Sequence, residues 1–187
     1  MKAGGSEPPD VLRVSCFLSS LDEVAAIRKQ VEQEYPKTAA DFVQTQRAPA
    51  RSLAACEAVA KSRRSTGTPV HVMNPEGLPV EAGASQIALV ASPKVVLTGT
   101  QVSFGFEEKD ARLAFQRVER VLQQAGVSMR DVAFAHFYPL AGGITVQVQK
   151  VRGEFFDPAR PPASSLLLFE GLPSMNAGFA IDVVAVK

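Results

Sequence analysis

Apolar residues at helical spacing predict two helices. The stronger one precedes residue 126, where apolar side chains recur every three or four residues and arginine and glutamate fill the positions between them. Its apolar positions are Ala111, Ala114, Phe115, Val118, Val121, Leu122 and Ala125. The other helix follows residues 20–23, Ser-Leu-Asp-Glu, which have the form of a capping box. Its apolar positions are Val24, Ile27, Val31 and Tyr35.

The pattern also repeats along the chain. Three segments of the first third recur in the same order after residue 124, with gaps of only a few residues between the copies. The pairs are 3–17 with 125–138, 31–35 with 151–155, and 56–60 with 181–185. We interpret the chain as about one and a half copies of one structural unit.

The longer copy begins with apolar segments that the shorter copy lacks. Residues 86–91 and 95–102 are predicted strands, separated by a Ser-Pro turn. Residues 143–151 alternate β-branched and polar side chains, which favours a strand, whereas the repeat predicts a helix there. We follow the repeat. The predicted fold class is α+β, with a complete β-β-α-β-α-β-β unit preceded by a partial β-α-β-β repeat.

This interpretation divides the chain into three parts. Residues 1–64 form the partial repeat, residues 65–82 form a linker rich in proline and glycine, and residues 83–187 form the complete domain. The partial repeat lacks the first strands and the long helix, so its sheet is predicted to have an open edge and an uncovered face. We therefore expect a homo-oligomer, a trimer or a multiple of one.

Charge and composition exclude several classes of partner. The 20 lysines and arginines balance 19 acidic residues, so the net charge is +1, and no concentrated basic face supports nucleic-acid or membrane binding. The first ten residues contain no apolar core of a secretory signal.

Cys16 and Cys56 are expected to be buried free thiols in a cytoplasmic protein. With His71 and His136 they are too scattered for a zinc site, and we expect no metal and no cofactor.

An ordered set of short motifs resembles a known family. The motifs occupy residues 83–86, 95–99, 124–126, 131–132, 154–156, 162–163, 171–173 and 181–185. Together they resemble the RidA/YjgF family of reactive-intermediate deaminases, also called endoribonuclease L-PSP. The resemblance covers the whole second copy and, in truncated form, the first.

The resemblance implies a chorismate-mutase-like fold and a barrel-like trimer with ligand clefts between subunits. It also implies hydrolysis of 2-imino or enamino acids to 2-keto acids and ammonia. In active members an arginine in a Pro-Ala-Arg-Ser motif clamps the substrate carboxylate, with a two-pronged geometry that a guanidinium supplies. A glutamate on the last strand positions water, and an aromatic residue lines the cleft.

This chain departs from the family at those positions. Ser164, followed by Ser165, occupies the arginine position, Asp182 occupies the glutamate position, and Ala84 lies near the aromatic position. The Ser-Gly pair of the second strand becomes Thr98-Gly99. The resemblance makes Asp182 the candidate catalytic carboxylate. It makes Thr98, Gly99, Ser164 and Ser165 candidate ligand contacts.

Three further residues are candidates outside that set. Glu57 fits the glutamate position of the first copy, whose arginine position falls near Ala40. Arg51 and Arg160 belong to Pro-Ala-Arg sequences that lie out of place for the family motif. They are either exposed loop residues or reach a ligand cleft across an interface.

Three functions remain open from the sequence. The first is an imine or enamine hydrolase without the carboxylate clamp, and the second is a non-catalytic subunit that binds a small molecule or serves in assembly. RNA cleavage ranks last, because a 7% aromatic content and a balanced charge provide neither a stacking platform nor a basic groove. His136 alternates with Phe134 and Tyr138 on a predicted strand, where we expect a structural role, and no Ser-His-Asp set has a recognisable spacing.

Overall fold

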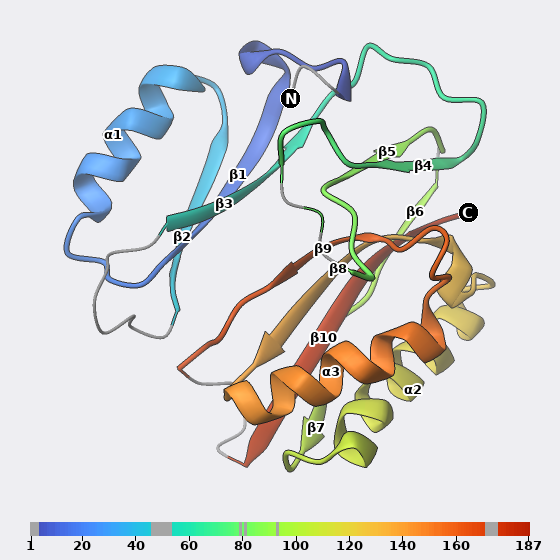
Figure 1. The fold of residues 1–187 in the computed structure, drawn as a ribbon. Helices are drawn as coiled ribbons and strands as arrows, with labels where there is room; N and C mark the ends of the chain where they lie inside the picture. The colour runs from blue at the N-terminus through green and yellow to red at the C-terminus, as the bar shows by residue number, and fades with distance from the viewer. Residues whose placement is uncertain (1–3, 46–53, 79, 81, 93, 171–175) are drawn as a thin grey trace. The chain divides into compact units, whose positions relative to one another are not determined.

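The computed structural model describes residues 4–45, 54–78, 80, 82–92, 94–170 and 176–187 of the 187-residue chain, without the side chain of residue 41. The chain divides into two compact units, Met1–Ser65 and Thr66–Lys187. Among the described helices, none combines the length and the apolar character needed to cross a membrane. Figure 1 shows the elements of both units.

The first unit is a small sheet with one helix. Its elements are η2 (Pro8–Asp10), β1 (Val11–Leu18), α1 (Val24–Glu34), β2 (Ala39–Gln44) and β3 (Ala54–Ala60). The strand order is β2-β1-β3, with β2 parallel and β3 antiparallel to the central β1. The apolar side of α1, with Ile27 and Val31, packs on Val14 and Leu18 of β1. The predicted β-α-β-β order is confirmed.

The expectation of free thiols was wrong. Cys16 on β1 and Cys56 on β3 are direct partners in the antiparallel register and form a disulfide, with their Cα atoms 4.1 Å apart. Residues that face each other across an antiparallel pair point to the same side of the sheet, which brings the two sulfur atoms together. The 40 residues between them hide this proximity from the sequence.

The second unit is a larger sheet with two helices on one face. Its elements are β4 (Val70–Met73), β5 (Ile87–Val90), β6 (Val95–Leu97), β7 (Gln101–Phe104), α2 (Glu108–Gln124), η3 (Met129–Asp131), β8 (Val132–Pro139), α3 (Gly142–Phe155), β9 (Ala163–Leu166) and β10 (Ala177–Val186). The main sheet has the order β6-β10-β8-β9, and β7 pairs with a second part of β10. Among the paired strands that the structure describes in this unit, β8 and β9 are parallel and the others antiparallel, and β4 and β5 form a separate pair.

The structure differs from the predicted elements in two places. The predicted strand 95–102 is two strands, since the chain leaves the ladder between β6 and β7 and pairs with β10 on both sides of the break. The predicted linker 65–82 contains a strand, because Val70 and Val72 of β4 pack with Ala88 of β5 in a small apolar cluster.

The helix predicted from the repeat over residues 143–151 is confirmed as α3. Its β-branched residues Ile144, Val148 and Val151 recur at helical spacing and are fully buried. The tertiary burial of this one face outweighs the strand preference of the individual residues.

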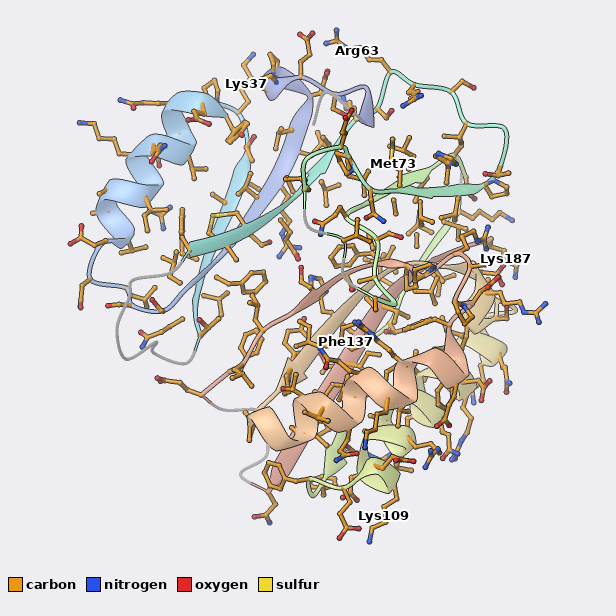
Figure 2. The ribbon with its side chains drawn as sticks, viewed as in Figure 1. Lys37, Arg63, Met73, Lys109, Phe137 and Lys187 are labelled. Atoms are coloured by element: carbon orange, nitrogen blue, oxygen red, sulfur yellow. A yellow bond between two sulfur atoms is a disulfide. The ribbon has the colours of Figure 1, made fainter. Side chains whose placement is uncertain are left out.

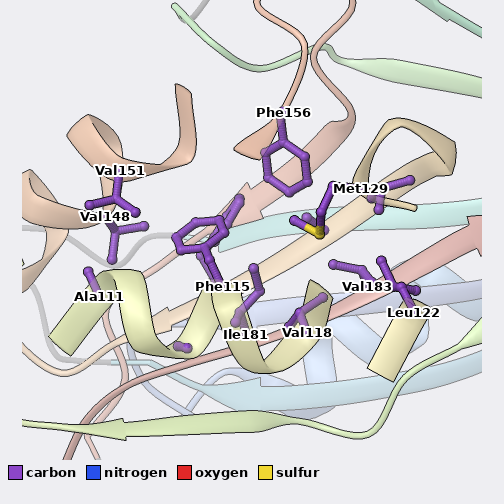
Figure 3. Close-up of a cluster of buried hydrophobic side chains, with 14 of the residues drawn as sticks. Ala111, Phe115, Val118, Leu122, Met129, Val148, Val151, Phe156, Ile181 and Val183 are labelled. Carbon is purple, nitrogen blue, oxygen red and sulfur yellow. The ribbon is translucent and has the colours of Figure 1, made fainter. Parts of the chain in front are cut away.

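The core of the second unit lies between the sheet and its helices. Figure 3 shows Phe115, Val118 and Leu122 of α2 directed at Ile181 and Val183 of β10. All of these side chains are almost completely buried, and so is Phe137 of β8, which Figure 2 labels. Helices α2 and α3 therefore cover the face of the sheet that carries Ala135 and Phe137 of β8 and the odd-numbered residues 179–185 of β10.

The alternate side chains of those strands point to the opposite face, which we call the outer face. It carries Phe134, His136 and Tyr138 of β8 and Asp182 of β10, all of them half-buried. The outer face thus holds the polar side chains of an otherwise apolar pair of strands.

Both units share one arrangement of elements. β1, α1, β2 and β3 have the same order and the same strand directions as β8, α3, β9 and β10. A glycine in the left-handed region precedes the 3-10 turn before each central strand, Gly5 with φ 72° and Gly126 with φ 73°. Ser15 faces Glu57 in the first unit as His136 faces Asp182 in the second.

Candidate functional site

Asp182, His136 and Tyr138 form a hydrogen-bonded group on the outer face. Asp182 and His136 are direct partners in the antiparallel register of β10 and β8. Oδ1 of Asp182 lies 2.9 Å from Nδ1 of His136, and Oδ2 accepts a hydrogen bond of 2.7 Å from the hydroxyl of Tyr138. Tyr138 stands two residues along β8, at the diagonal position that long side chains reach across a sheet. Both oxygens of the carboxylate are therefore engaged.

Aromatic neighbours hold the imidazole of His136 in place. The ring of Phe134 meets it edge-on at 4.7 Å between centroids, and the ring of Tyr138 stacks on its other side at 5.8 Å. Phe169 in turn packs against Tyr138 at 5.0 Å. The His136 and Asp182 side chains retain exposed fractions of 21% and 19%. The pair is thus partly dehydrated and partly exposed to solvent.

This arrangement suits general acid-base chemistry. An ionised Asp182 only accepts hydrogen bonds, so Nδ1 of His136 carries the proton that is donated to it. In the neutral imidazole the lone pair is then on Nε2. A histidine with its tautomer set by a carboxylate removes or returns a proton at Nε2, as in hydrolases that activate water or a hydroxyl.

The register of β9 decides which serine shares this face. Ser165 is the direct partner of His136, so its side chain points to the outer face. Ser164 is the partner of Ala135, and the next residue on that side, Leu166, packs against the core. The structure therefore brings Ser165 to the row of His136 and Asp182 and places Ser164 on the helix-covered side.

Thr98 and Gly99 directly follow β6, and Thr98 is hydrogen-bonded to the neighbouring strand β10. The hydroxyl of Thr98 accepts a hydrogen bond of 3.0 Å from the backbone N–H of Val183, and its own N–H donates to the Val183 carbonyl. Gly99 is exposed, and a Cβ there meets no atom within 4 Å. The Thr98 hydroxyl thus satisfies a backbone N–H of β10 at the residue after Asp182, which gives Thr98 a structural role.

The other sequence candidates lie elsewhere or outside the described residues. Nη2 of Arg160 donates to the carbonyl of Arg130, 2.7 Å away, which holds the loop after α3 to the turn before β8. Glu57 belongs to β3 of the first unit, opposite Ser15. Ala84 is buried in the second unit. Arg51 lies outside the described residues.

Sequence reasoning missed His136 and Tyr138 as site residues. Their alternation with Phe134 correctly indicates one face of a strand, but nothing in their spacing points to Asp182, which follows His136 by 46 residues and Tyr138 by 44. The usable signal was the repeat, because it aligns Asp182 with Glu57, and both carboxylates face the central strand of their sheet. Across the described ranges, no three His, Cys, Asp or Glu side chains are grouped to hold a metal ion.

Comparison with known proteins identifies the fold. No family model and no curated protein matches the chain. Among solved structures, the YyfB protein of the Rid family from Yersinia pestis, of unknown function, aligns with a TM-score of 0.59 and 20% identity over 64% of this chain and 100% of its own. Rv2704 of the YjgF/YER057c/UK114 family from Mycobacterium tuberculosis covers 63% of this chain and 99% of its own, at 21% identity and a TM-score of 0.46.

A third similar structure is Escherichia coli TdcF with bound serine, with 20% identity, a TM-score of 0.46, and coverage of 62% of this chain and 93% of its own. At these identities the likeness concerns the fold. The α+β, chorismate-mutase-like fold that the motifs implied is confirmed by the mixed architecture and by the alignment with YyfB.

Proposed function

We propose that this chain is a Rid-type protein that binds a small imine or enamine on the outer face of its second unit and hydrolyses it to a carbonyl compound and ammonia. The observation that carries the proposal is the contact between Asp182 and His136. Asp182 occupies the position of the water-positioning glutamate in the resemblance, and the partly buried His136, 2.9 Å away, supplies a proton acceptor beside it.

The reaction needs one proton acceptor that later becomes a donor. Nε2 of His136 takes a proton from water while the oxygen adds to the carbon of the C=N bond. The nitrogen gains a proton and, when the carbinolamine collapses, leaves as ammonia, so the carbonyl product forms without a redox step. Asp182 holds the imidazole and stabilises its protonated form between the two steps.

The substrate we propose lacks a carboxylate next to the C=N carbon. The arginine position of the resemblance is Ser164, on the helix-covered side, and Arg160 is bound to a backbone carbonyl. Without a guanidinium the site forgoes a charge-assisted pair worth about 1.5–3 kcal/mol, roughly a 10- to 150-fold effect on rate or affinity. A neutral imine does not require that pair.

We also propose that the first unit is a truncated copy of the second. Its support is the shared order, direction and register of the strands, which pairs Val14 with Ala40 as it pairs Ala135 with Ser164. In the second unit β10 is flanked by β6 and β7, whereas β3 pairs only with β1 among the described strands. Val59 of β3 is 59% exposed. A strand edge and apolar surface of this kind favour a homo-oligomer.

A non-catalytic binding role is the second candidate. It is favoured by Ser164, which stands at the position where active members of the resembled family carry the arginine that clamps the substrate. The aromatic rings around His136 provide a binding surface in either case.

Hydrolysis of imines made in place by an amine oxidase or an amino-acid oxidase tests the proposal. Semicarbazide competes for the imine, so catalysis appears as loss of semicarbazone. We expect wild type to hydrolyse the uncharged imines faster than the 2-imino acids, and Asp182→Asn to lose at least about tenfold in rate. Glu119→Gln, which removes a carboxylate from helix α2 on the other side of the sheet from Asp182, is the matched control and keeps the wild-type rate.

Two variants test which serine position can hold an arginine that binds the substrate carboxylate. Ser165→Arg places a guanidinium on the outer face and is expected to raise the rate on 2-imino acids, whereas Ser164→Arg is not. Absence of imine hydrolysis in wild type and in both arginine variants overturns the catalytic proposal and leaves the binding role.

A further inference from the structure

Ser165, His136 and Asp182 lie in one row across three adjacent strands. Asp182 faces His136 in the register of β10 and β8, and His136 faces Ser165 in the register of β8 and β9. Residues at the same register position point to the same side of a sheet, with Cβ atoms about 5 Å apart between neighbours. The three functional groups thus occur in the order carboxylate, imidazole, hydroxyl.

The orientation of the imidazole directs its two nitrogen atoms toward the two neighbouring strands. Nδ1 lies on the side of the ring that faces Asp182 on β10. In an imidazole, Nε2 belongs to the opposite edge of the ring, so it is directed toward the far side of β8, where β9 carries Ser165. The stacked ring of Tyr138 and the edge contact of Phe134 keep the imidazole in this plane.

We propose that Ser165 is a nucleophile activated by His136 and Asp182, and that the outer face also transfers acyl groups from small activated esters to water. This activity shares His136 and Asp182 with the proposed function but does not require imine hydrolysis. Triads are defined by the roles and geometry of their members, which here come from three strands of one sheet.

The surroundings of Ser165 suit an acyl acceptor. Its side chain is half-buried, so a small ester reaches it while bulk water is partly displaced. β9 ends the strand order of the described main sheet, and at its start Ser85 bridges Ala163 and donates its N–H to the Pro162 carbonyl. The candidate donors for a developing oxyanion are the outward N–H groups of β9 beyond that bridge. The Tyr138 hydroxyl holds the second oxygen of Asp182 and keeps the carboxylate in position.

The reaction balances without a cofactor. The Ser165 oxygen attacks the ester carbonyl carbon as its proton moves to Nε2 of His136, and the tetrahedral intermediate expels the alcohol, which takes that proton. Water then attacks the acyl-serine, gives its proton to Nε2, and releases the carboxylic acid with Ser165 restored.

An alkyl fluorophosphonate is the probe that tests Ser165 directly. Attack of the Ser165 oxygen on phosphorus expels fluoride and leaves a stable phosphonyl ester, which intact-mass spectrometry counts and peptide mapping locates. We expect one label on Ser165 in wild type, none in Ser165→Ala, and at least about a tenfold slower reaction in Asp182→Asn and His136→Gln. Ser164→Ala, a neighbour on the opposite face, is the matched control and labels at the wild-type rate.

A pair of cysteine variants makes the test independent of the serine probe. Among the described residues no cysteine is free, since Cys16 and Cys56 are bonded to each other. Ser165→Cys is expected to react with iodoacetamide at neutral pH at least about tenfold faster than Ser164→Cys, because a histidine next to a thiol promotes the thiolate. Changing His136 to glutamine in the Ser165→Cys background is expected to abolish that advantage.

Absence of the phosphonyl label from folded wild type, its location on another residue, or equal thiol reactivity of the two cysteine variants overturns the inference. Circular dichroism and thermal melting confirm that each variant is folded. Label on Ser165 without imine hydrolysis overturns only the proposed function, and imine hydrolysis without label overturns only this inference.

Discussion

The role predicted for His136 from the sequence differs from the role that its contacts in the structure support. Its alternation with Phe134 and Tyr138 predicted a structural residue on a strand, and the aromatic contacts on both sides of its ring fit that description. The contact with Asp182, however, sets its tautomer and puts the lone pair of the neutral ring on Nε2, in a side chain that is 21% exposed. Both roles depend on the same carboxylate.

The tautomer of His136 is a direct prediction at this scale. Because Asp182 accepts from Nδ1, the neutral imidazole is expected to carry its proton there, and Asp182→Asn is expected to weaken that preference. Nitrogen-15 chemical shifts of the ring, measured on protein labelled at histidine, distinguish the two tautomers. His71, on β4, is the internal reference. Finding the Nε2–H form of His136 in wild type contradicts the assignment of its base.

At the scale of elements, the two helices of the second unit are joined by an ion-pair cluster. Arg112 of α2 donates to both oxygens of Glu154 on α3, at 2.9 and 2.6 Å, and to Glu108 one turn earlier. This two-pronged contact lowers the pKa of the Glu154 carboxyl below its ordinary value of 4.5, since hydrogen bonding to Arg112 favours the ionised form.

The lowered pKa of Glu154 makes the stability of the folded protein depend on pH in a defined direction. A carboxyl whose folded pKa lies below its unfolded pKa stabilises the fold at pH values above the unfolded pKa. That contribution decreases as the pH falls through the unfolded and then the folded pKa. Glu154→Gln is therefore expected to lower the melting temperature slightly at neutral pH and to match wild type in acid. Because the pair is exposed, the difference is expected to shrink in high salt.

Melting curves between neutral and acidic pH measure this contribution. The control is Lys109→Gln at the start of α2, where the lysine pairs with Glu107 of the same helix end and projects away from the fold (Figure 2). A Glu154→Gln deficit that persists unchanged in acid contradicts an origin in the Arg112 pair.

At the scale of the whole molecule, the disulfide distinguishes the two units. It joins the central strand of the first unit to β3, which has no other partner among the described strands. The second unit instead holds the corresponding strand, β10, with β6 and β7 and with the helix α2. Disulfides persist mainly in oxidising compartments. The prediction of a cytoplasmic protein was based in part on free cysteines, and the disulfide removes that support.

Removing the disulfide is expected to destabilise the first unit selectively. Replacing both cysteines with alanine frees a loop of 40 residues, and the cost is about 2–4 kcal/mol of unfolding free energy in the chain-entropy model. Hydrogen exchange during denaturant titration reports on each unit separately. Loss of protection in β1 and β3 with unchanged protection in β8 and β10 is the expected result. Equal loss in both units contradicts a local role of the bond.

The sequence alone determined both of the helices expected from apolar spacing and the order of elements around each central strand, because these depend on the spacing of apolar residues along one segment and on the repeat. It predicted α2 from its apolar stripe, and the repeat predicted α3 against the strand preference of Ile144, Val148 and Val151. The ordered motifs also indicated the fold that the alignment with YyfB confirms.

Only the tertiary structure decided which distant residues meet, because the register between strands is a property of the assembled sheet. It joined Cys16 to Cys56 and His136 to Asp182, and it split the strand expected over 95–102 between two parts of β10. It also separated Ser164 from Ser165. A shift of one residue along a strand exchanges the two faces of a sheet, so the choice of serine followed from the pairing of β8 with β9 and not from the motif.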